Sequence, residues 1–226
     1  MKVLAVIPAR GGSKSIPGKN VKIVAGKPLI AHTIENAKKS KMIDRIIVST
    51  DDERIGTVAE QYGAQVVWRP SEISGDTAAS ELALLHVLDF LEESERYVPD
   101  ILVFLQCTSP LTSADDIDGT IEALLDRDAD SALAVIPFHY FLWSYDELGN
   151  AVGINHEKET RLMRQQREPE FRETGGVYAM RTQGFEVAKH RFFGRTALHV
   201  TAPEHCLEID EPADIAIAEI LLREQE

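Results

Sequence analysis

Cysteine is scarce in this sequence: of 226 residues, only Cys107 and Cys206 are cysteine, and they do not form a CxxC pair. The seven histidines are scattered along the chain and include no HExxH motif. Disulfide scaffolds and zinc sites both need closely spaced cysteine or histidine residues. The sequence therefore gives no support to either class of protein.

A long apolar run and an excess of positive charge are also lacking. No stretch reaches the length of about 20 apolar residues that a membrane helix needs, and the short apolar run that ends at Pro8 has no signal-peptide pattern. The formal net charge is −13, whereas nucleic acids and anionic membranes select basic surfaces. We expect a cytoplasmic protein that binds neither a membrane nor nucleic acid.

The apolar residues that are present alternate between two patterns. The composition, 44% hydrophobic and 27% charged, suits one globular domain over residues 1–226. Apolar β-branched runs predict strands at 2–8, 45–50, 64–68, 100–106 and 131–137. Helical patterns lie between them at 28–40, 52–62, 77–95 and 113–127. This alternation predicts a three-layer α/β fold with a mostly parallel sheet.

Local features refine this prediction. Apolar positions run almost all round the helix at 77–95, so we expect it to be buried, with Asp76 or Thr77 as its N-cap. A last helix is expected to follow Asp210 as N-cap. Residues 138–175 show no clear period, which indicates a β-rich excursion or flap.

Polar segments follow three of the predicted strands: "ARGGSK" from Ala9, "TDD" from Thr50 and "QCTSP" from Gln106. In open α/β sheets, ligands bind beyond the carboxyl ends of the strands. We therefore expect these segments to meet at one edge of the sheet.

The start of the chain is purely cationic. The first acidic residue is Glu35, and the cations before it are Lys2, Arg10, Lys14, Lys19, Lys22 and Lys27. In an acidic protein, this segment is either kept for a polyanion or is a solvated lysine-rich face.

The loop "ARGGSKSIPGKN" belongs to neither common phosphate-binding pattern. Five residues separate Gly12 from Gly18, and Asn20 stands where a Walker A loop has Ser or Thr; GxGxxG is absent as well. Glycines still let backbone N–H groups approach phosphate oxygens, and Arg10 and Lys19 can neutralise a triphosphate. The alternative is an ordinary strand-to-helix loop.

Seven segments in this order resemble the N-acylneuraminate (nonulosonate) cytidylyltransferases, that is, the CMP-sialic acid synthetases. They are "IPARGGSKSIPGKN", "VSTDDERI", "RPSEISGDTAASELALLHVL", "LQCTSPLTSADDID", "RQQREPEFRETGGVYAM", "HRFFG" and "EIDEPADIAIAE". The resemblance implies a nucleotide-diphospho-sugar transferase-like fold, CTP and a nonulosonic acid as substrates, and Mg²⁺ as cofactor, with Mn²⁺ as an alternative. It also implies a homodimer, with residues 138–195 as a β-rich flap and dimerisation excursion, and CMP-sugar and pyrophosphate as products.

The resemblance also implies site residues. Arg10, Lys19 and Asp210 would be catalytic, with Arg10 stabilising the departing pyrophosphate. The nucleotide-binding residues would be Ala9, Arg10, Gly11, Ser13, Lys19, Asn20, Arg69, Ala78 and Ser80. The sugar-binding residues would be Gln106, Arg164, Arg172, Tyr178, Phe192 and Phe193.

The expected metal ligands are Asp210 and Glu208, because Mg²⁺ prefers hard oxygen donors. Asp214 more readily stabilises the first turn of the last helix. Phe192 and Phe193 are either walls of an acyl pocket, supplied across the dimer, or core residues.

The sequence departs from the family pattern at three places. Cys107 replaces a proline, Glu208 replaces an aspartate, and Thr174-Gly175 replaces Asn-Gly. We interpret Cys107 as a buried thiol and not as a nucleophile. The substrate stays open among N-acetylneuraminate, a legionaminate, a pseudaminate and KDN.

Two alternative functions follow from the same motifs. The first is a CMP-Kdo synthetase, although its first motif typically reads "ARxxSxRLPGKPL", which differs from this chain at Lys14 and Asn20. The second is a nucleotide-binding homologue without catalytic activity, which we would expect to have lost Arg10, Lys19, Gln106 or Asp210.

Overall fold

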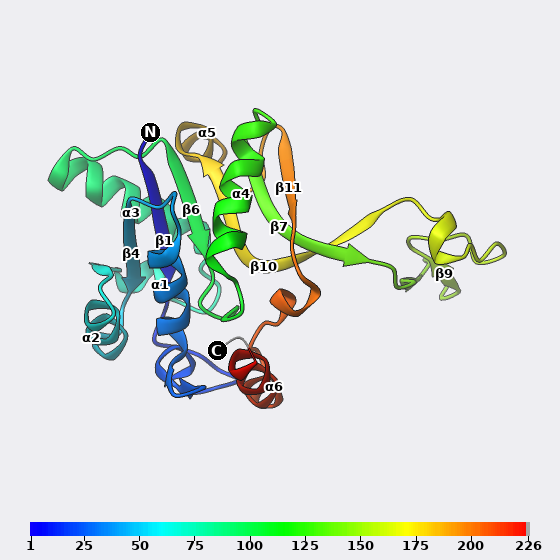
Figure 1. The fold of residues 1–226 in the computed structure, drawn as a ribbon, viewed down its shortest axis with the longest axis horizontal. Coiled ribbons are helices and arrows are strands. Elements are labelled where there is room, and N and C mark those ends of the chain that lie inside the picture. Colours follow the sequence, from blue (N-terminus) through cyan, green and yellow to red (C-terminus); the bar gives the residue numbers. More distant parts are fainter. Residues whose placement is uncertain (225–226) are drawn as a thin grey trace.

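The computed structural model describes residues 1–224, and a sheet of seven strands forms its centre (Figure 1). Its strands, in spatial order, are β11 (Thr196–Val200), β7 (Ser131–Phe138), β10 (Glu170–Arg181), β6 (Ile101–Leu105), β1 (Val3–Pro8), β4 (Arg45–Thr50) and β5 (Gln65–Trp68). Strand β10 runs antiparallel to β6 and β7, and the other neighbours pair parallel. The predicted mostly parallel α/β sheet is confirmed.

Helices cover both faces of this sheet. One layer contains α1 (Leu29–Lys39), α2 (Glu53–Gln61) and α4 (Ala114–Asp126); the other contains α3 (Ser80–Glu95) and α5 (Thr182–Ala188). Alternation along β1 explains the layers, because Ala5 and Ile7 face the first while Leu4 and Val6 face the second. These side chains are fully buried, which makes β1 the centre of the core.

Smaller elements complete the fold around the sheet. A two-stranded sheet joins β2 (Ile23–Val24) and β3 (Lys27–Pro28) just before α1. Short 3-10 turns are η1 (Lys19–Val21), η2 (Ser71–Ile73), η3 (Arg164–Gln166) and η4 (Pro203–Cys206). The last helix, α6 (Pro212–Arg223), packs its buried residues against Ile209 and the β2 region. Within residues 1–224, no helix has both the length and the apolar character needed to cross a membrane.

The expected N-caps of two helices are wrong. Helix α3 begins at Ser80 after Ala79, which offers no capping side chain, and Asp76 pairs with Arg10 instead. Helix α3 is also less buried than expected, because Leu82 and Phe90 are exposed.

For α6, the N-cap is Glu211 and not Asp210. Glu211 and Asp214 form a capping box, in which Asp214 accepts from the backbone N–H of Glu211 at 2.7 Å. The expected role of Asp214 in the first helical turn is therefore confirmed. The backbone N–H of Asp210 also donates to Asp214, at 2.9 Å, whereas the Asp210 side chain takes no part in the cap.

Strands β7 and β10 extend beyond the sheet as a long ribbon (Figure 1). The ribbon ends in the small hairpin of β8 (Trp143–Tyr145) and β9 (Ala151–Gly153). Within the predicted 138–195 excursion, Tyr178 and Phe185 are buried in the core of the main body. The part that leaves the main body therefore precedes Tyr178, and its proposed role in dimerisation stays a prediction.

Candidate active site

The loops that follow β1, β4 and β6 meet at one edge of the sheet, as their polar composition predicts. The backbone N–H of Gly11 donates to Asp51 Oδ1 at 2.9 Å. Asn20 Nδ2 donates to the carbonyl oxygen of Arg10 at 3.0 Å, and Cys107 Sγ lies 3.1 Å from Asn20 Oδ1. These bonds tie the first loop to the loops after β4 and β6.

A cavity of about 340 Å³ opens at this edge. It is lined by Pro8, Arg10, Gly12, Ser13, Lys14, Ser15, Lys19, Asn20, Arg69, Ala78, Ser80, Phe104, Gln106, Cys107, Thr108 and Asp210. We call it the first cavity. Most residues predicted to bind the nucleotide line it, together with Gln106 and Asp210.

Two predicted nucleotide-binding residues do not line the first cavity. Ala9 is buried, and Gly11 packs so closely to Asp52 that a Cβ atom would collide with that side chain. Both residues therefore contribute to the packing of the loop.

Sequence reasoning missed several residues of the first cavity. Lys14 belongs to the cationic opening segment, so its charge was the available signal. Phe104 and Thr108 flank Gln106 on a strand and its loop, and only the structure shows which of their side chains face the cavity.

The cations of the first cavity have different partners. Arg10 Nη1 and Lys14 Nζ each lie 2.5 Å from a carboxylate oxygen of Asp76, which is partly exposed. Arg69 donates to the backbone oxygen of Ser49 at 2.6 Å, and burial lowers the pKa of its guanidinium.

Lys19 reaches a third partner, the C-terminal segment. Its Nζ donates to the carbonyl oxygen of Ile209 at 2.7 Å and to Asp210 Oδ1 at 3.1 Å. Only 11% of the Lys19 side chain is exposed, while 68% of Asp210 is. The lysine therefore holds Asp210 at the mouth of the cavity without burying its carboxylate.

Cys107 is buried, as predicted. Burial raises the pKa of its thiol to about 11, so the group is protonated at neutral pH. A protonated thiol is a poor nucleophile, which agrees with a packing role.

A second cavity, of about 460 Å³, lies beside the first. It is lined by Ile136, Arg172, Pro203, Glu204, Cys206, Leu207, Glu208, Asp210, Asp214 and Leu221. Asp210 lines both cavities, so they adjoin at this residue.

Gln106 and Glu208 form the wall at this junction. Gln106 Nε2 donates to the carbonyl oxygen of Gly175 at 2.6 Å and to Glu208 Oε1 at 3.1 Å. Burial raises the pKa of the Glu208 carboxyl, and the nearby charge of Asp210 raises it further. Gly175 has φ +78°, where any other residue is strained, and a Cβ there would displace the Glu208 carboxylate.

The remaining residues predicted to bind the sugar line neither cavity. The Tyr178 ring is buried and stacks on Phe104 with centroids 5.3 Å apart, while its hydroxyl donates to Glu173. Burial raises the pKa of this hydroxyl. Phe192 lies edge-on against Tyr178, which leaves it among core neighbours within one chain.

Phe193 and Arg164 also line neither of the two cavities. Phe193 packs against Gly184 of α5. Arg164 lies on the ribbon, where it lines a separate cavity with Phe138 and Phe171. A role for Arg164 in binding the sugar, and for Phe192 and Phe193 as walls of an acyl pocket across a dimer, stays a prediction.

Two solved structures of low sequence identity are similar to this chain in fold. CMP:2-keto-3-deoxy-manno-octonic acid synthetase complexed with CTP matches with a TM-score of 0.73 at 19% identity, covering 100% of both chains. The 4-diphosphocytidyl-2C-methyl-D-erythritol synthase of Anaerococcus prevotii matches with a TM-score of 0.70 at 16% identity, covering 98% of both chains. At these identities, the similarity shows the fold alone.

Proteins of similar sequence say more about the family of this chain. Over 222 residues, the chain is 33% identical to N-acylneuraminate cytidylyltransferase of Oncorhynchus mykiss, covering 96% of this chain and 49% of that protein. It is 33% identical to CMP-N,N'-diacetyllegionaminic acid synthase of Legionella pneumophila, covering 98% and 97%. It is 31% identical to pseudaminic acid cytidylyltransferase of Campylobacter jejuni, covering 99% and 97%.

The chain thus spans about half the length of the trout relative and nearly all of the two bacterial ones. The family model for cytidylyltransferases matches residues 4–200, which include the first loop, Gln106 and Arg172. With its fold and its similarity over most of the chain, this protein belongs to the cytidylyltransferase family.

Proposed function

We propose that this protein couples CTP to a nine-carbon 3-deoxy-2-ulosonic acid, giving a CMP-sugar and pyrophosphate. The observation that carries the proposal is the meeting of two cavities at Asp210, one lined by cations and the other containing Arg172. Such an arrangement suits a triphosphate on one side and a carboxylated sugar on the other.

CTP belongs in the first cavity. Arg10, Lys14 and Lys19 would bind the phosphate oxygens, and Arg69, Ala78 and Ser80 would contact the base and ribose. Arg10 would also stabilise the charge that develops on pyrophosphate as the bond between the α-phosphorus and the bridging oxygen breaks.

The acid sugar belongs in the second cavity. Arg172 can bind its carboxylate with two parallel hydrogen bonds, which fixes orientation as well as position. Gln106, at the junction, can donate to one sugar oxygen and accept from a hydroxyl. The anomeric hydroxyl would then lie close to the α-phosphorus, with most of the rate gain coming from this positioning.

The carboxylates at the junction fit a divalent metal whose coordination is completed by oxygen atoms of the substrate. Within residues 1–224, no three histidine, cysteine or acidic side chains are grouped to hold a metal by themselves. Mg²⁺ is usually held by one or two carboxylates together with phosphate oxygens and water. Asp210 is the primary ligand that we propose, with Glu208 beside it; when bound, Mg²⁺ would neutralise charge on the phosphates.

We further propose a homodimeric, cytoplasmic enzyme with a single domain and the 138–195 segment as its dimerisation excursion. The ribbon supports a dimer because it exposes large apolar side chains, among them Tyr140, Trp143, Tyr145 and Leu148.

The test is pyrophosphate release from CTP and Mg²⁺ with a panel of nonulosonic acids plus Kdo. Turnover with a nine-carbon acid is the expected result, and it would also identify the substrate. Turnover with Kdo alone would favour CMP-Kdo synthesis, the alternative that the sequence motifs leave open. CTP binding with no turnover on any acid would favour a homologue without catalytic activity.

A further inference from the structure

A buried carboxylate, Asp116, lies in the first turn of α4. It accepts hydrogen bonds from the backbone N–H and the hydroxyl of Ser113, both at 2.8 Å, and so completes the N-terminal cap of the helix. Its side chain is only 6% exposed. Capping explains the contact with Ser113 but not the other partners of this carboxylate.

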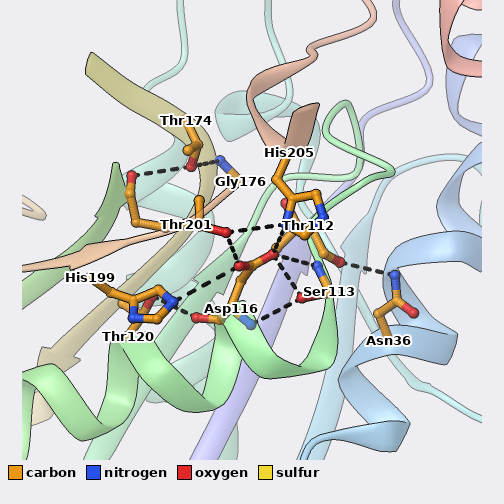
Figure 2. A network of polar contacts seen from close by, with 11 residues as sticks. Asn36, Thr112, Ser113, Asp116, Thr120, Thr174, Gly176, His199, Thr201 and His205 are labelled. Atoms are coloured by element: carbon orange, nitrogen blue, oxygen red, sulfur yellow. Dashed lines mark hydrogen bonds and ion pairs between the residues drawn. The ribbon is translucent and has the colours of Figure 1, made fainter. Parts of the chain in front are cut away.

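Those other partners come from a distant part of the chain (Figure 2). His205 Nδ1 lies 2.7 Å from Asp116 Oδ2, and the hydroxyl of Thr201 donates to Asp116 Oδ1. His199 Nε2 lies 3.9 Å from Oδ1. Thr201 and His205 also contact each other, at 3.1 Å, so the segment that follows β11 is fastened to α4 at one point.

The same segment is fastened again a few residues later. The backbone N–H of Ile209 donates to the carbonyl oxygen of Thr108 at 2.8 Å, and Lys19 donates to the carbonyl oxygen of Ile209. Glu208 and Asp210 flank this second attachment. Their carboxylates therefore lie on a short segment that is held at His205 and at Ile209.

We propose that Asp116 and His205 are positioning residues, which fix the segment of Glu208 and Asp210 at the junction of the two cavities. This inference rests on the proposed function, in which those two carboxylates hold the metal. Neither Asp116 nor His205 lines either cavity, so neither is a catalytic residue.

The charges of the pair agree with this role. Burial by itself would raise the pKa of Asp116, but hydrogen bonds from His205 and Thr201 outweigh it and lower that pKa to about 2. The hydrogen bond to Asp116 raises the pKa of His205. Removing either partner would leave a buried or half-buried charge without compensation, so the contact is more than an exposed ion pair.

Another aspartate on the same helix offers a matched control. Asp118 accepts from the hydroxyl of Ser40 and, at 3.0 Å, from the backbone N–H of Lys41, and so joins α4 to the end of α1. Asp118→Asn removes a helix-borne carboxylate with two partners, but it leaves residues 199–210 untouched.

The experiment measures the segment and its metal binding separately from turnover. Hydrogen exchange of peptides covering 203–212 is compared in wild type, Asp116→Asn, His205→Ala and Asp118→Asn. Mn²⁺ binding in the presence of CTP is measured on the same proteins by electron paramagnetic resonance. We expect faster exchange and about tenfold weaker Mn²⁺ binding in Asp116→Asn and His205→Ala, and neither change in Asp118→Asn.

A conservative variant keeps the proposal testable if His205→Ala folds poorly. In His205→Asn, the amide nitrogen can replace Nδ1 as donor to Asp116, so we expect slow exchange and most of the Mn²⁺ affinity to return. Binding of CTP without metal should change by less than about twofold in all variants.

Two results would overturn the positioning role: unchanged exchange at 206–210 in Asp116→Asn and His205→Ala, or an equal loss of Mn²⁺ affinity in Asp118→Asn. The proposed function fails in a different way. If the wild-type protein releases no pyrophosphate but Asp116→Asn still speeds exchange of the segment, the proposed function is wrong. The attachment of the segment by Asp116 and His205 would then still hold.

Discussion

The two cavities that meet at Asp210 are built in different ways. The first is assembled from loops that directly follow adjacent parallel strands, so its residues are clustered in a few short stretches of sequence. The second draws on β7, β10 and the C-terminal segment, which converge only through the antiparallel strand and the loop after β11. The proposed phosphate site thus arises from local motifs, whereas the proposed sugar site depends on the whole topology.

Removing the group that both cavities share should have the largest effect. Asp210→Asn removes the proposed anionic metal ligand, so we expect kcat to fall by about 100-fold or more. Steady-state pyrophosphate release at saturating CTP measures this. Glu219→Gln, in the following helix, is the control; a wild-type rate in Asp210→Asn would exclude the aspartate from the metal site.

Arg172→Ala should separate the two cavities. Loss of a guanidinium that pairs with the sugar carboxylate should raise the KM for the acid by about 30-fold or more. The Kd of CTP should stay within about twofold, because Arg172 does not line the first cavity. Equal losses on both substrates would contradict separate binding sites.

Gly175→Ala tests how closely the second cavity is built around Glu208. The positive φ and the overlap with the Glu208 carboxylate should cost about 1–2 kcal/mol of stability. The displaced carboxylate should impair use of the sugar more than CTP binding. Thermal unfolding together with the KM for each substrate measures both effects. Gly149→Ala, also at positive φ but with open space around it, controls for backbone strain alone.

Asp76→Asn should give the smallest effect and the opposite sign. Asp76 pairs with Arg10 and Lys14, which we expect to bind phosphate, so the aspartate competes with CTP. Because the carboxylate is exposed, we expect only about two- to fivefold tighter CTP binding, decreasing with salt. Calorimetric titration at two ionic strengths measures it, and weaker binding would assign Asp76 to the nucleotide site itself.

The proposed dimer bears on the second cavity alone. If the ribbon of a partner completes the sugar site, sedimentation should show a dimer, and shortening the β8–β9 hairpin should reduce use of the sugar but not CTP binding. A strict monomer with full activity would defeat the cross-subunit role of Phe192 and Phe193.

The sequence predicted the parallel sheet and most of the first cavity, because strand periodicity and loop chemistry are local. It did not predict that Asp76 pairs with Arg10 and does not cap α3. From the sequence, the backbone N–H groups of the helix are as good a partner for this carboxylate as a distant cation. It did not predict the second cavity either. Nothing near Asp116 or His205 in the sequence indicates that they meet, because that contact depends on where β11 delivers the chain.

The bonds of Lys19 have a consequence for the order in which the protein becomes competent. Lys19 and Ile209 are 190 residues apart, and contacts of such separation form late because a long loop must be closed first. In a chain whose sheet has already formed, we thus expect the cations of the first loop to be in place while Asp210 is still absent from the mouth of the first cavity. The site for the complete reaction would therefore form only late in folding, after the central strands have paired.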